Sequence, residues 1–152
     1  MPEEEAFGVL VRLLKEHHMR SFYLPTMEGL HVAMYQLDAL IAEMLPALHH
    51  YFAVFNISTI MYASEWFMTI LVTSVPHQVA LRLFDVFLVE GQEMIFRVGL
   101  AMLTRNQAEL LTLNYDGLLQ HLKVILLLTN NPILIKYIKY SNNTSTTVIT
   151  RT

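Results

Sequence analysis

Charged residues at helical spacing are the first candidates for chemistry in this chain. Arg82 and Asp85 stand three residues apart, and Glu93 and Arg97 stand four apart, so each pair can share one face of a helix. Such a pair is either a local ion pair that fixes packing or a charged group that orients a partner. Arg97 could equally pair with a residue of another helix.

Aromatic residues form a second group of candidates. Tyr62, Trp66 and Phe67 fall within one apolar segment, and Trp66 with Phe67 could line a groove that receives another protein. The alternative is that they fill the core on a buried helix, as large aromatic side chains most often do. The nine methionines at helical spacing also fit a core.

Histidine pairs invite a metal hypothesis at His17-His18 and at His49-His50. Adjacent residues on a helix point about 100° apart, so neither pair provides the two ligands on one face that helical metal sites use. We therefore expect no metal site. The sequence also shows no nucleophile–base pair and no phosphate loop, which argues against a stand-alone metabolic enzyme.

Composition narrows the class of protein. The 152 residues carry a net charge of −3, with 54% hydrophobic and 15% charged residues and no cysteine. A general nucleic-acid binder needs a basic surface, so the net charge argues against one. The lack of cysteine excludes disulfides and thiolate metal sites. The acidic start is unlike a signal peptide, and Glu65 interrupts the apolar segment 57–75, so we expect no transmembrane segment and a cytoplasmic protein.

Helices must position these side chains, because apolar residues recur at helical spacing along most of the chain. We expect an all-α fold of about six to eight helices. The predicted helices cover 2–17, a stripe over 30–44 with Thr26 as N-cap, 46–55, 61–75, 76–90 closed by Gly91, 92–104, a short helix over 108–113 capped by Asn106, and a last helix from Asp116 to about Leu128.

Residues 129–152 differ from the rest of the chain. They begin with a short β-branched stretch and end in a polar segment of low complexity. We expect a divergent, disordered tail there and a helical domain over residues 1–128.

The order of several segments carries a resemblance to a known family. The segment 61–70 (MYASEWFMTI) resembles the YAxxWFLT stretch of TBC domains, 82–85 (RLFD) is similar to the RxWD or RxFD motif, and 95–101 (IFRVGLA) resembles IFRVALALL. The segments 106–111 and 116–121 resemble the Evi5-like branch, which lies near the RabGAP1-like branch. The chain thus resembles the C-terminal half of a Rab-GAP TBC domain over about residues 3–123.

This resemblance implies activation of GTP hydrolysis on a Rab family small GTPase in vesicle and membrane traffic. TBC domains act through an arginine finger in IxxDxxR and a glutamine finger in YxQ. An arginine supplied in trans is worth about 10³ to 10⁵ in rate. Neither motif can be assigned here, and Tyr35-Gln36 lacks the intervening residue. We therefore expect the chain to be inactive alone, either as part of an activator or as a non-catalytic Rab- or protein-binding helical module.

Further expectations follow from the same resemblance. The GTP and Mg²⁺ belong to the Rab partner, so the chain needs no cofactor of its own, and the Rab would recruit it to endomembranes. Several helices are apolar on more sides than half a domain can cover, which predicts exposed apolar surface. The candidates for a Rab-facing groove, or for a structural role, are Tyr62, Trp66, Phe67, Arg82, Asp85 and Arg97.

Overall fold

Eight α-helices and no strand make up residues 2–124, the part of the chain that the computed structural model describes. This confirms the predicted all-α fold. The tail expected over 129–152 and the predicted helix end at Leu128 lie outside the described residues. The helices are α1 (Glu3–Lys15), α2 (Arg20–Tyr23), α3 (Glu28–Met44), α4 (Pro46–Val54), α5 (Ile60–Met68), α6 (His77–Glu90), α7 (Glu93–Leu110) and α8 (Tyr115–Val124).

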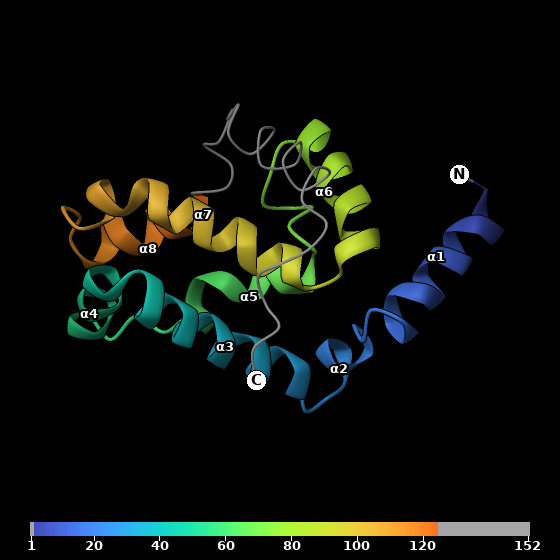
Figure 1. Ribbon diagram of the computed structural model, residues 1–152, viewed down its shortest axis with the longest axis horizontal. Coiled ribbons are helices and arrows are strands. Elements are labelled where there is room, and N and C mark those ends of the chain that lie inside the picture. Colours follow the sequence, from blue (N-terminus) through green and yellow to red (C-terminus); the bar gives the residue numbers. More distant parts are fainter. Residues whose placement is uncertain (1, 125–152) are drawn as a thin grey trace.

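The central helix is α5, which packs against α3, α7 and α8. Helix α4 covers one end of α3, and α6 packs on α7 (Figure 1). The four-residue α2, which periodicity did not predict, joins α1 to α3. Helix α1 projects away from the other helices, with its N-terminal end farthest out (Figure 1). Within residues 2–124, no helix combines the length and the apolar character needed to cross a membrane.

Proline and glycine set three helix boundaries where the sequence predicted them. Pro46 is the first residue of α4, and Pro76 stands directly before α6. Gly91 follows the end of α6 with φ of +70°, a conformation that glycine adopts at little cost, and its N–H donates to the Phe87 carbonyl at 2.8 Å.

The helix predicted over 61–75 ends early, and that prediction is wrong in its second half. Helix α5 stops at Met68, and Ile70 and Leu71 then take positive φ angles of 54° and 62°. Such angles are uncommon for residues with a side chain, most of all for a β-branched one. The turn buries both Ile70 and Leu71, so the reason for the early stop is apolar burial that a continued helix would not give.

The short helix predicted over 108–113 does not form separately. Helix α7 continues unbroken to Leu110, because Leu110 is buried in the core on the same helix as Leu103, two turns earlier. Asn106 lies inside this helix, where its Nδ2 donates to the Met102 carbonyl at 2.8 Å. A side chain engaged with the preceding turn cannot cap a new helix.

Two predicted N-caps are also wrong. Thr26 does not cap α3, because Met27 stands between them, in the N-cap position and with φ of 46°. Asp116 lies within α8, and the cap is Asn114, whose Oδ1 accepts a hydrogen bond from the Gly117 N–H at 3.0 Å. Asparagine is among the strongest N-cap residues, so Asn114 provides the N-cap hydrogen bond that was expected from Asp116.

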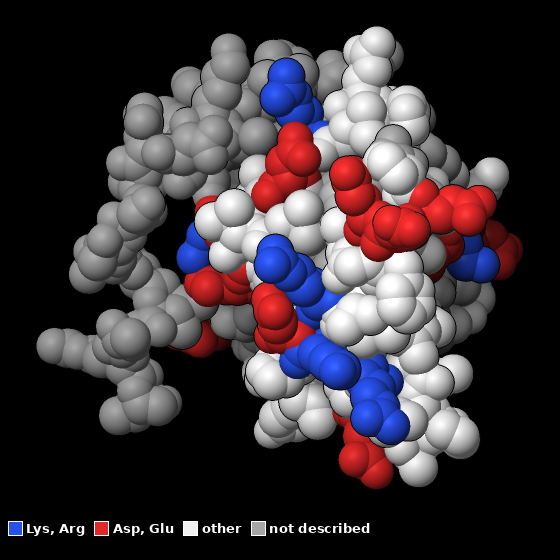
Figure 2. All heavy atoms as spheres, turned by 90° about the vertical axis from the view of Figure 1, so that its right-hand side faces the viewer, with Lys and Arg blue, Asp and Glu red and all other residues white. Residues whose placement is uncertain are grey.

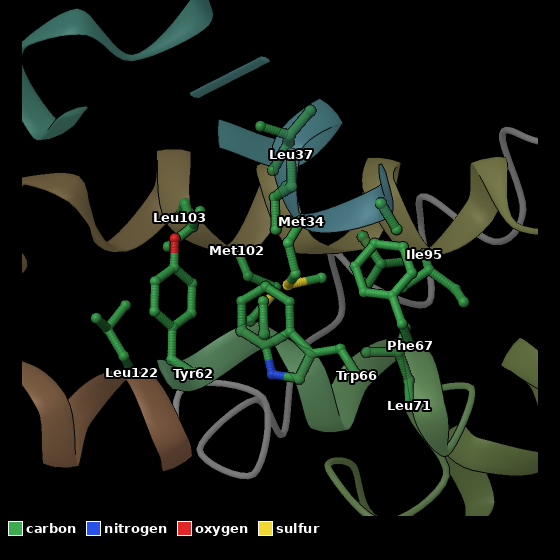
Figure 3. Packing of buried hydrophobic residues seen from close by; sticks show 14 of the residues in the cluster. Met34, Leu37, Tyr62, Trp66, Phe67, Leu71, Ile95, Met102, Leu103 and Leu122 are labelled. Carbon is green, nitrogen blue, oxygen red and sulfur yellow. The ribbon is translucent and has the colours of Figure 1, made fainter. Parts of the chain in front are cut away.

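The core is built around Trp66, whose side chain is 1% exposed. Figure 3 shows the indole ring of α5 beside Met34 of α3 and Met102 of α7. Gly99 of α7 lies directly against this ring, because a Cβ added there would be 3.0 Å from Cζ3 of Trp66. The missing side chain at Gly99 therefore allows α7 to approach α5 closely.

Gly99→Ala should lower the free energy of unfolding by about 1–3 kcal/mol, because the added methyl group would press on the Trp66 ring. The matched control is Gly8→Ala in α1, where the new Cβ meets nothing within 4 Å. That change should raise the free energy of unfolding by about 0.5–1 kcal/mol through helix propensity alone. Urea unfolding followed by circular dichroism measures both, and changes of the same sign would contradict the close approach.

Candidate functional site

The predicted aromatic candidates lie in the core. Tyr62, Trp66 and Phe67 are all buried on α5. The rings of Tyr62 and Trp66 meet edge to face at 5.4 Å between centroids, and Phe67 meets Phe96 of α7 at 4.8 Å. The structure places these three residues in the second of the two roles considered for them, that of core packing.

The hydroxyl group of Tyr62 has an unusual environment for a buried polar atom. Among the described residues it has no hydrogen-bond partner, and Figure 3 shows it directed toward Leu103. Burial raises the pKa of Tyr62 strongly, and the Asp38 carboxylate adds to that shift. The phenol is therefore neutral over the whole physiological range.

Arg82 and Asp85 lie on the outer side of α6, where both are exposed. They form no ion pair with each other within residues 2–124, so the structure does not support the first of the two roles considered for them, that of a local ion pair. Exposed apolar residues flank them, with Val89 84% exposed. We define the α6 face as Leu81, Arg82, Asp85, Leu88 and Val89.

Arg97 connects the end of α6 to the start of α7. Its guanidinium group donates to the carboxylate of Glu93, as the four-residue spacing predicted. It also donates to Oε2 of Glu90 at 3.1 Å, across the turn at Gly91. The two interpretations given for Arg97, a local pair and a pair between helices, are therefore both correct. Arg97 therefore fixes the turn between α6 and α7.

A cleft of about 570 Å³ opens beside the α6 face, between the α1–α2 junction, α3 and the α6–α7 turn. We call it the α3–α6 cleft. Val32 and Val89 supply apolar walls, and Glu28 and Glu90 supply carboxylates. Because Val89 belongs to both, the α6 face and the cleft form one continuous surface.

His17 holds one wall of this cleft in place. Its ring packs on Phe87 of α6 at 5.3 Å between centroids, and its carbonyl accepts a hydrogen bond from Nε2 of Gln92 at 3.0 Å. Sequence reasoning considered His17 only as a metal ligand and missed this packing role, for which the sequence offers no signal. Over the described part of the chain, no three His, Asp or Glu side chains gather closely enough to hold a metal ion.

A second cleft, of about 650 Å³, lies between α3, α4 and the segment that leads into α5. His49 and Asp38 face each other there at 3.5 Å, and Tyr35 is exposed at its edge. Sequence reasoning missed this cleft. The available signal was that Tyr35 and Asp38 share the polar side of the helical stripe over 30–44, opposite its apolar residues.

The family model described as the RabGAP TBC domain matches residues 1–149. The match reaches beyond the domain end predicted at residue 128, and that boundary stays a prediction. It covers nearly the whole chain, including the helices that form the α6 face and both clefts.

Curated relatives agree with this match. Over 126 residues, or 83% of this chain, the chain is 47% identical to the "Ecotropic viral integration site 5 protein" of Mus musculus. It is 43% identical over 80% of its length to the "Rab GTPase-activating protein eat-17" of Caenorhabditis elegans, and 38% identical over 80% to the "GTPase-activating protein GYP5" of Saccharomyces cerevisiae. The aligned part spans only 16%, 14% and 14% of these relatives.

Arg97→Ala should lower the free energy of unfolding by about 1–2 kcal/mol, because two carboxylates lose charge-assisted hydrogen bonds at a partly buried turn. The control is Arg12→Ala, which removes an exposed ion pair with Glu16 at 4.0 Å and should cost less than about 0.5 kcal/mol. Chemical unfolding of both variants tests this. Equal costs would mean that the Arg97 cluster adds no more than a surface pair.

Tyr62→Phe should leave the free energy of unfolding unchanged or raise it by up to about 1 kcal/mol, since the removed hydroxyl group is buried without a partner. Tyr51→Phe is the matched change, because the Tyr51 hydroxyl donates to the Leu113 carbonyl at 2.8 Å. It should cost about 0.5–1.5 kcal/mol. A larger loss for Tyr62→Phe than for Tyr51→Phe would show that the Tyr62 hydroxyl does have a stabilising partner.

Proposed function

The chain belongs to the RabGAP TBC domain family, and we propose that it forms part of a GTPase-activating protein for Rab family small GTPases. The observation that carries the proposal is 43% identity, over 80% of this chain, to a relative whose name states that activity. The chain supplies the C-terminal part of the domain. Its role is to hold the GTP-bound Rab while hydrolysis is accelerated.

We propose a division of labour in this reaction. The arginine and glutamine fingers of the family sit in motifs that cannot be assigned in this sequence, so the groups that act on the γ-phosphate come from outside the 152 residues. GTP and Mg²⁺ are supplied by the Rab. This chain contributes the surface that contacts the Rab. The large aromatic residues Tyr62, Trp66 and Phe67 cannot form that surface, because they are buried.

The α6 face is the surface that best fits a Rab. Its apolar residues, Leu81, Leu88 and Val89, are exposed and surround the two charged residues, Arg82 and Asp85. Apolar contact area combined with a few charged groups is typical of transient protein interfaces. The adjoining α3–α6 cleft extends this surface and can receive a protruding side chain of the partner.

The same surface supports the second candidate function, a non-catalytic module that binds a Rab or another protein without stimulating hydrolysis. The exposed α6 face is the observation that favours it, since binding needs only that face. In both cases the Rab, which sits on endomembranes, would bring the chain to its place of action on the cytoplasmic side.

A single-turnover assay with a panel of GTP-loaded Rabs tests the proposal. We expect the 152-residue chain to bind at least one Rab and to accelerate hydrolysis less than about twofold, against about 10³- to 10⁵-fold for an activator with its arginine in place. Strong stimulation by the chain alone would show that it holds the fingers. Absence of binding to every Rab would contradict the proposed function.

Substitutions then locate the interface. Arg82→Glu and Val89→Glu should each weaken Rab binding about tenfold, because each puts a carboxylate into the contact. Met44→Glu is the control, since Met44 is equally an exposed apolar residue but lies at the end of α3, outside the α6 face. Weaker binding of the Met44→Glu variant alone would place the Rab elsewhere.

A further inference from the structure

The helices α3, α4 and α5 come from a part of the chain that contains neither lysine nor arginine. No Lys or Arg occurs between Arg20 and Arg82, and the acidic residues of this stretch are Glu28, Asp38, Glu43 and Glu65. Figure 2, which looks onto the side from which α1 projects, shows both signs of charge on that side. The surface that α3, α4 and α5 form among themselves instead offers carboxylates without Lys or Arg, so a partner that matches it is basic.

The second cleft, between α3, α4 and the segment that leads into α5, lies within this region, and we call it the α3–α4 cleft. Its lining includes three buried apolar residues, Met34, Phe52 and Ile57. Asp38 is the one carboxylate among its described lining residues, and none of them is Lys or Arg. The structure thus places an acidic group beside an apolar base, and no Lys or Arg of the cleft balances its charge.

One wall of the α3–α4 cleft is a single side of α3. His31, Tyr35 and Asp38 follow one another at spacings of four and three residues, so they are neighbours along the helix. Tyr35 is 76% exposed, and its ring meets no other aromatic ring within residues 2–124. The Asp38 side chain is 54% exposed, and its Oδ2 lies 3.5 Å from Nε2 of His49. An exposed ring one turn away from an exposed carboxylate can receive the planar guanidinium group of an arginine, which stacks on the ring and donates to the carboxylate.

The other wall of the cleft is the segment between α4 and α5. Asn56 and Ser58 expose their side chains there, and each can both donate and accept a hydrogen bond. These groups suit the N–H and C=O groups of a peptide backbone that lies along the cleft. The volume of about 650 Å³ falls within the range of small-ligand sites, so the cleft has room for a few residues of a partner and not for a folded domain.

We propose that the α3–α4 cleft binds an arginine side chain that a partner protein presents on a short extended segment. The guanidinium group lies on the Tyr35 ring and donates to the Asp38 carboxylate, which His49 helps to orient. The apolar stem of the arginine packs toward Met34 and Ile57. This inference does not rest on Rab binding, because α4 lies far from the α6 face (Figure 1), and each can fail without the other.

Two peptides that differ in one charge test the proposal on the full 152-residue chain. The probe is acetyl-Ala-Arg-Ala-amide, and its control replaces the arginine by citrulline, which has nearly the same shape and no charge. Saturation-transfer NMR should show saturable binding of the arginine peptide with a dissociation constant of about 1 mM. The citrulline peptide should bind at least about threefold more weakly, and raising the salt from about 0.1 M to about 1 M should remove most of that difference.

Substitutions in α3 locate the binding in this cleft. Asp38→Asn should weaken binding of the arginine peptide about threefold. Glu43→Gln makes the same change of charge at an exposed position of the same helix, outside the cleft, and should leave binding unchanged. Tyr35→Leu should weaken binding about threefold and Tyr35→Phe should not, because only the second keeps the ring. All three positions are exposed, so circular dichroism should show unchanged folding for every variant.

Four outcomes would overturn the proposal. The first is an arginine peptide that shows no saturable binding, and the second is a citrulline peptide that binds equally well. Equal losses for Asp38→Asn and Glu43→Gln would show a general attraction of cations to the acidic surface, without a site in the cleft. Equal affinities of the Tyr35→Leu and Tyr35→Phe variants would show that the ring does not contact the arginine.

Discussion

The contact between Trp66 and Gly99 sets how closely α5 and α7 approach, and α3, α6 and α8 pack against these two helices. The indole ring occupies the space between α3 and α7, and α7 can come near only because it has no side chain at that point. Helix α5, fixed in this position, packs against α3, α7 and α8. Tyr62 and Phe67 extend the contact along α5, and the chain after Met68 turns back to bury Ile70 and Leu71. The α6 face is thereby directed outward, because the opposite side of α6 packs on α7.

Much of this architecture could be predicted from periodicity and from punctuation by proline and glycine. The boundaries at Pro46, Pro76 and Gly91 are local effects of restricted or permissive backbone angles, and local effects can be read from the sequence. The failures at Asn106 and 61–75 have another cause. Each depended on which apolar residues the tertiary structure would bury, and buried contacts can override a capping preference or a helical period.

The candidate site was less predictable than the fold, for a geometric reason. Spacing shows that Arg82 and Asp85 share a side of a helix, but it does not show whether that side is exposed. The same holds for Trp66 and Phe67, where an aromatic pair fits a groove and a core equally well. Arg97 was predictable through Glu93, because both residues lie on one helix. Its second partner, Glu90, belongs to another helix and required the α6–α7 turn to be known.

Residues 61–70, which most strongly indicate the family, are not the residues proposed to contact a partner. Residues 61–70 carry the clearest resemblance to TBC domains, yet their large side chains form the core. The resemblance at these positions is therefore evidence for the fold. Function resides in sites placed on a fold. The exposed residues of the α6 face, with Val89 at the edge of the α3–α6 cleft, are free to vary without disturbing the packing around Trp66. If the α6 face binds a partner, as proposed, that partner can change while the fold persists, because the exposed and the packed residues lie on different sides of the same helix.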